Sequence, residues 1–259
     1  MMKNAMLLIV MNIVAAVVTI VFNGLSQALP IGLATTADIA NRLPILFFPA
    51  NLTFSIWGVI YIGWIAFAVY QALPAQRSNP FVRAVGWWFV LGSLGNMGWL
   101  LLFQYLQFAP SMIPILWLLV TLGIIYVRIR RVNASPSNAD RWAIFVPFSI
   151  YFAWAAVATV ANTTYVLFPG EGALWLGLAQ ETWAALMLVV AGGITGVVAY
   201  VNRDIPYFLV IVWAFVGIIL RYPSVQLVVV TAAAVAGLGV LVVFARSLLG
   251  RSVQSRAAA

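Results

Sequence analysis

Long apolar runs, separated by prolines or short polar clusters, dominate the pattern of this chain. A helix needs roughly 20 mostly apolar residues to cross about 30 Å of hydrocarbon. The runs reach that length and lack the alternation that marks a transmembrane β-strand. We predict eight membrane-spanning helices over residues 5–29, 51–73, 82–108, 112–130, 141–167, 174–200, 206–221 and 224–248. Seven spans, with 206–248 partly re-entrant, is the alternative interpretation.

The distribution of basic residues agrees with eight spans. With the amino terminus in the cytoplasm, 11 of the 13 basic residues fall on the cytoplasmic side and only Arg42 and Arg221 on the other. Cytoplasmic loops of membrane proteins carry such an excess of lysine and arginine. We therefore predict that both termini are cytoplasmic and that the host membrane is a bacterial inner membrane.

Composition narrows the class of protein further. The chain is 65% hydrophobic and 7% charged, with a mean hydropathy of +1.08, whereas soluble proteins carry about 25% charged residues. It has no cysteine and no histidine, which excludes disulfides, thiol nucleophiles, Cys/His metal sites and histidine acid–base catalysis. We find no nucleophile–base pair or phosphate-binding loop, so we predict a protein that is not an enzyme and holds no metal. The isoelectric point near 10.3 reflects basic loops and not nucleic-acid binding.

Three predicted spans carry aromatic residues and amides at helical spacing. Trp57 and Tyr61 share one face, and each of the other two stripes includes an asparagine inside the membrane. A buried amide must face protein, water or ligand, because it is costly in hydrocarbon. A pocket lined by aromatic rings, with only a few polar groups, would suit a planar and mostly apolar molecule. The candidate ligand-binding residues are Trp57, Tyr61, Asn96, Trp99, Phe103, Tyr151, Trp154 and Asn162.

The same stripes carry a resemblance to a known family. The segments are Pro49 to Trp64, with Phe54, Trp57 and Ile60-Tyr61; Asn96 to Phe103, with Trp99; and Pro147 to Asn162, with Tyr151, Trp154 and Ala158. In this order they resemble the second, third and fifth helices of the TspO/MBR family, the tryptophan-rich sensory or translocator proteins. Leu102 and Phe148 stand where the family has phenylalanine and tyrosine. The resemblance covers about residues 1–168.

The resemblance implies a five-helix core enclosing a cavity under the first loop, lined by the candidate residues. It implies binding of porphyrins and other tetrapyrroles, sterols or carotenoid-like molecules, a sensory, regulatory or trafficking role linked to tetrapyrroles or photosynthesis, and dimerisation. Membrane lipid and a planar small molecule are the expected partners; no cofactor is obligatory, and a bound tetrapyrrole or lipid is the candidate. We predict two parts: a five-helix core over 1–168, and three additional helices with a basic tail over 169–259, outside the usual family.

Two further features bear on the site. The apolar connection 30–50 is expected to fold over the outer mouth of the bundle. Glu181 is predicted about seven residues into the sixth span, roughly 10 Å along the helix. A carboxyl at that depth is a candidate ligand contact or proton-coupling group. We favour an ion pair with Arg42 or Arg221, because a proton relay would need a second buried acid.

Two other functions remain open. Small residues at 191–196 and 232–239 favour close helix packing, so the chain is also a candidate accessory or assembly subunit of a larger membrane complex, such as a pigment–protein complex. The other alternative is a secondary transporter. Transporters of this kind often contain internal repeats with matching interrupted helices, and we find no sequence similarity of that sort between 1–130 and 141–248.

Overall fold

The computed structural model describes residues 2–29, 31–42, 45–167 and 176–257, and all regular structure in these ranges is helical. The longer helices are α1 (Met2–Ala28), α3 (Ile56–Ala72), α5 (Trp88–Gln104), α6 (Phe108–Arg130), α8 (Val146–Leu167), α9 (Gln180–Asn202), α10 (Ile205–Arg221) and α11 (Gln226–Ala257). The short elements are α2 (Thr36–Arg42), η1 (Asn51–Ser55), η2 (Pro74–Gln76), α4 (Pro80–Val85), α7 (Asn138–Asp140) and η3 (Arg141–Phe145).

The predicted all-helical membrane fold is confirmed. Among the described residues, five helical stretches are long and apolar enough to cross a membrane: Met6–Ala28, Asn51–Ala72, Phe108–Arg130, Asn138–Leu167 and Gln180–Asn202. Ile205–Arg221 and Gln226–Leu241 are shorter apolar helices. The run predicted over 82–108 is divided into α4 and α5, because the chain turns at Gly86, whose φ of +55° favours glycine.

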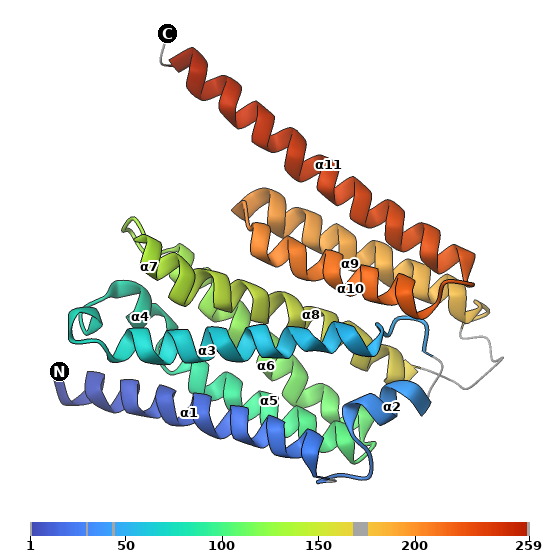
Figure 1. Cartoon of the computed structure of the whole chain (residues 1–259), viewed down its shortest axis with the longest axis horizontal. Helices are drawn as coiled ribbons and strands as arrows, with labels where there is room; N and C mark the ends of the chain where they lie inside the picture. The colour runs from blue at the N-terminus through green and yellow to red at the C-terminus, as the bar shows by residue number, and fades with distance from the viewer. Residues whose placement is uncertain (1, 30, 43–44, 168–175, 258–259) are drawn as a thin grey trace. The chain divides into compact units, whose positions relative to one another are not determined.

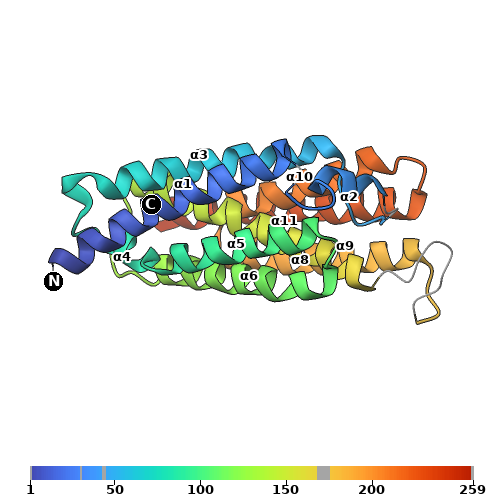
Figure 2. The same ribbon diagram turned by 90° about the horizontal axis from the view of Figure 1, so that it is seen from below.

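The chain forms two compact units. The N-terminal unit comprises the described residues up to 42 and Phe54–Val166, and the C-terminal unit comprises 45–53 and the described residues from Leu167 onward. In the N-terminal unit α5 packs most extensively on α6, while α1 packs on both α3 and α5. Figures 1 and 2 show α1, α3, α5, α6 and α8 running alongside one another in this unit.

Helices α3 and α8 approach each other closely, and this approach positions several of the aromatic side chains that they carry. A Cβ on Gly63 would lie 2.8 Å from Cβ of Pro147, so only glycine fits at this crossing. Just before Pro147, the chain makes a π-helical turn over Arg141–Phe145, and this turn also packs on α3. Trp64, next to Gly63, is thereby held against Tyr151 of α8, with ring centroids 4.9 Å apart.

The C-terminal unit contains α9, α10 and α11, which pack on one another pairwise. Two of the small residues noted above serve this packing. A Cβ on Gly192 would overlap Val235 of α11, and a Cβ on Gly239 would lie 2.6 Å from Cε2 of Phe208 in α10. Part of the small-residue pattern is therefore used inside this unit.

Residues 45–53 lie along α10. The Ala50 N–H donates to Gly217 O at 2.9 Å, Trp213 Nε1 donates to Thr53 O at 3.0 Å, and the Tyr222 hydroxyl donates to Ile45 O at 2.8 Å. Burial raises the pKa of the Tyr222 hydroxyl, an effect that the neighbouring Arg221 partly offsets. The connection predicted over 30–50 thus continues into a segment of the C-terminal unit.

The first part of that connection belongs to the N-terminal unit. The N–H groups of Leu33 and Ala34 donate to Gln104 O, at the end of α5, at 3.0 and 3.3 Å. Gly32 fits closely there, since a Cβ would lie 2.6 Å from Cβ of Gln104. Helix α2, which follows, also packs on α5.

Candidate functional site

Six aromatic side chains from α3, η1 and α8 form one continuous set of ring contacts, which we call the α3–α8 aromatic cluster: Phe54, Trp57, Tyr61, Trp64, Tyr151 and Trp154. The Trp57 ring lies 5.8 Å from Tyr61, 6.2 Å from Tyr151 and 6.5 Å from Trp154. Trp64 meets Tyr151 edge-on at 4.9 Å, and Phe54 meets Trp154 at 5.8 Å. The edge-on geometry is the one that aromatic pairs favour. Four predicted site residues, Trp57, Tyr61, Tyr151 and Trp154, therefore come together.

Three other predicted residues meet elsewhere in the same unit, around Asn162. Its Oδ1 accepts from Trp99 Nε1 at 3.4 Å and from Ser111 Oγ at 3.0 Å. Its Nδ2 donates to Phe108 O at 3.3 Å and to Met112 Sδ at 2.8 Å. Phe103 packs beside this group, with its ring 5.5 Å from Trp99. Because all four hydrogen-bonding positions of the amide are filled, Asn162 joins α5, α6 and α8 and leaves no position for a ligand.

Asn96 lies between α1 and the aromatic cluster. Its Oδ1 accepts a hydrogen bond of 2.8 Å from Asn23 Nδ2, and its side chain is fully buried. Its amide lies close to the Tyr151 hydroxyl, and neither Asn96 Nδ2 nor that hydroxyl has a well-formed hydrogen bond. Asn96 therefore directs an unpaired N–H₂ group at the cluster.

The polar atoms without a partner at the cluster share one chemical character. They are Asn96 Nδ2, Trp64 Nε1, Trp154 Nε1 and the Tyr151 hydroxyl, and their residues are almost completely buried. Three are donors only, the hydroxyl can also donate, and none belongs to a charged residue. A buried donor without a partner costs about 1–3 kcal/mol. The arrangement is therefore suited to a neutral molecule that brings hydrogen-bond acceptors.

Glu181 is not at the predicted depth. Helix α9 begins at Gln180 and not at 174, so Glu181 lies in its first turn, and its side chain is exposed. A carboxylate there is favoured by the positive end of the helix dipole. Arg42, one of its predicted ion-pair partners, has a side chain outside the described residues.

Sequence reasoning missed the contribution of α1. Asn12, Thr19, Asn23 and Ser26 are all buried, and Gln104 Nε2 donates to Ser26 O at 3.0 Å. Their spacing of seven, four and three residues would have indicated one polar helix face. Ser111 was missed for a different reason, since nothing in its local sequence reveals its partner 51 residues away.

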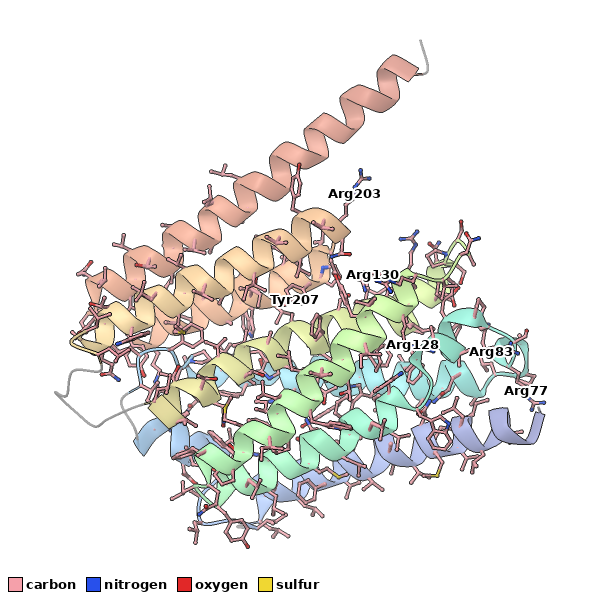
Figure 3. The ribbon with its side chains drawn as sticks, turned by 180° about the vertical axis from the view of Figure 1, so that it is seen from behind. Arg77, Arg83, Arg128, Arg130, Arg203 and Tyr207 are labelled. Carbon is pink, nitrogen blue, oxygen red and sulfur yellow. The ribbon has the colours of Figure 1, made fainter. Side chains whose placement is uncertain are left out.

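A second polar cluster lies near the end of α3. Buried Asp140 accepts from the Tyr70 hydroxyl at 2.9 Å, from Asn79 Nδ2 at 2.6 Å and from the Ser137 hydroxyl at 2.7 Å. We call these four residues the Asp140 cluster. Figure 3 shows Arg77, Arg83 and Arg128 towards the same end of the N-terminal unit, and Arg128 Nε donates to Ala84 O at 2.8 Å.

A family model described as TSPO-like protein matches residues 9–245. No curated protein and no solved structure matches the chain. The matched range includes α9, α10 and most of α11. Because the match covers nearly the whole chain, this protein belongs to the TSPO-like protein family.

Proposed function

We propose that this integral membrane protein binds a planar, mostly apolar molecule at the α3–α8 aromatic cluster, in a sensory, regulatory or trafficking role and without enzymatic chemistry of its own. Trp57 and Tyr61 are partly exposed beside the buried Tyr151 and Trp154. A flat molecule lying against these two rings would bury apolar surface on both partners.

The observation that carries the proposal is the set of unpaired donors behind those rings. Asn96 Nδ2 and Trp154 Nε1 have no acceptor, and each is buried beside the cluster. A ligand with carbonyl, hydroxyl or ring-nitrogen acceptors would satisfy them, which favours tetrapyrroles and sterols over purely hydrocarbon molecules. Trp99 differs, because its indole N–H already donates to Asn162.

The experiment is a titration with protoporphyrin IX, read from the absorbance band of the porphyrin. The protein is held in lipid nanodiscs, and the Kd is compared among three forms: the parent, Trp154→Phe and Trp142→Phe. Trp154→Phe keeps a ring but removes the donor, so we expect its Kd to rise about fivefold, the equivalent of roughly 1 kcal/mol.

Trp142→Phe is the matched control, because Trp142 is 72% exposed and takes no part in the cluster. Its Kd should equal that of the parent protein. Absorbance changes that never saturate, or the same Kd in both variants, would reject binding at this cluster.

A further inference from the structure

Helix α1 presents a polar face to the interior of the N-terminal unit. Asn12 and Thr19 are completely buried, and Asn23 is 4% exposed. Their spacing of seven and four residues puts them on one side of the helix, along roughly 16 Å of its axis. Gln71 of α3 and Asn96 of α5, both completely buried, face them from the neighbouring helices. We call these five residues the α1 seam.

Several atoms of the α1 seam lack a partner even though the side chains meet in pairs. Asn12 Nδ2 donates to Gln71 Oε1 at 3.1 Å, which leaves Asn12 Oδ1 and Gln71 Nε2 unpaired. Asn23 Nδ2 donates to Asn96 Oδ1, which leaves Asn96 Nδ2 unpaired. Between the two pairs, the Thr19 hydroxyl also has no partner.

These unpaired atoms determine what could occupy the seam. They comprise an acceptor, two donors and a hydroxyl that does both, all carried by uncharged side chains. An apolar molecule would leave them unsatisfied, and an ion would find no opposite charge on them. Water is the smallest molecule that donates and accepts together, and buried water typically serves polar atoms in this situation.

We propose that the α1 seam holds a connected file of buried water molecules. The file runs from the Asn12–Gln71 pair, past Thr19, to the Asn96 amide. One end of the file lies at the Asn12–Gln71 pair, next to the last residue of α3. At the other end, water would bridge Asn96 and the Tyr151 hydroxyl, which lie close together without a well-formed hydrogen bond. The inference concerns the protein without ligand, and a ligand that accepted from Asn96 Nδ2 would replace the last water of the file.

Water-edited solid-state NMR of the full chain in deuterated lipid tests this directly, without any added ligand. The measurement follows magnetisation transfer from water to the side-chain NH₂ groups of asparagine and glutamine. Asn162 is the matched control, because it is equally buried but its Nδ2 has two protein partners. We expect transfer to Asn12, Gln71 and Asn96 to build up at least threefold faster than transfer to Asn162.

A second arm tests whether the water is continuous. Thr19→Val keeps the shape of the side chain but removes the hydroxyl, and should slow transfer to Asn96 at least twofold. Thr159→Val should leave it unchanged, because the Thr159 hydroxyl is buried and already donates to Ala155 O at 2.7 Å.

Three results would overturn the proposal. If Asn12, Gln71 and Asn96 are as slow as Asn162, the seam is dry. If Asn12 and Gln71 are fast but Asn96 is slow, an isolated water is present and no file exists. If Asn162 is as fast as the rest, the interior is generally wet and the seam is not a distinct path.

Discussion

The Asn23 side-chain amide donates a 2.8 Å hydrogen bond to Asn96 Oδ1, which joins α1 to α5 across 73 residues of sequence. This bond satisfies the acceptor of Asn96 and leaves its donor, Nδ2, directed at the aromatic cluster. A single interhelical contact therefore holds the polar group on which the proposed ligand contact depends.

Removing the Asn23 amide should weaken the α1–α5 packing. We expect Asn23→Leu to lower the free energy of unfolding by about 1 kcal/mol, since interhelical hydrogen bonds in membrane proteins contribute about that much. Unfolding in mixed detergent and sodium dodecyl sulfate micelles measures it. The control is the double variant Asn23→Leu/Asn96→Leu, whose loss should be smaller than the sum of the single losses. Strict additivity would show that the two amides are not coupled.

Asn162 should matter more for stability than its neighbour Ser111. Asn162→Ala leaves Trp99 Nε1 without an acceptor and removes the links to α6, so we expect a loss of about 2–3 kcal/mol in the free energy of unfolding. Ser111→Ala should lose about 1 kcal/mol or less, because it removes a single hydroxyl. The same unfolding assay measures both. Equal losses of unfolding free energy in the two variants would show that Asn162 is no more important than Ser111 for joining these helices.

Gly217 should be essential for the packing of 45–53 on α10. A Cβ there would overlap the Thr53 hydroxyl and lie 2.9 Å from Cβ of Pro49, so Gly217→Ala should displace the segment. We expect faster amide hydrogen exchange in the peptide 45–53, whose Ala50 N–H donates to Gly217 O.

Gly193→Ala supplies the comparison for that experiment, because a Cβ at Gly193 has nothing within 4 Å. Its exchange at 45–53 should match that of the parent protein. An unchanged exchange rate in Gly217→Ala would show that the segment tolerates the extra methyl group.

Glu181 should not take part in ligand binding. It is exposed in the first turn of α9, so Glu181→Gln should lower the free energy of unfolding by only about 0.3–1 kcal/mol, through the helix dipole. The Kd for protoporphyrin IX should not change. A rise of tenfold or more in that Kd, in a folded variant, would restore the carboxyl as a ligand contact.

The all-helical fold of this protein could be predicted from the sequence alone, because a membrane-spanning helix is determined by its own local sequence. Lipid offers no hydrogen bonds to the backbone, so an apolar run of sufficient length must satisfy its own backbone as a helix. The helices could therefore be predicted, and the motifs that they carry indicated the family. The sixth span was predicted to start at 174, whereas α9 begins at Gln180. The prediction was wrong because residues 174–179 are as apolar as a helix interior, so hydrophobicity does not mark the helix start.

Only the tertiary structure decided which polar groups are already used. Asn96 and Asn162 look alike in sequence, each an amide within an aromatic stripe, yet Asn162 has four partners and Asn96 keeps an unpaired donor. Their partners come from helices distant in the chain, α1 for Asn96 and α6 for Asn162, and helical periodicity carries no information about which helices meet. Hydrophobicity specifies that these residues face inward, but the packing of neighbouring helices specifies what each of them meets.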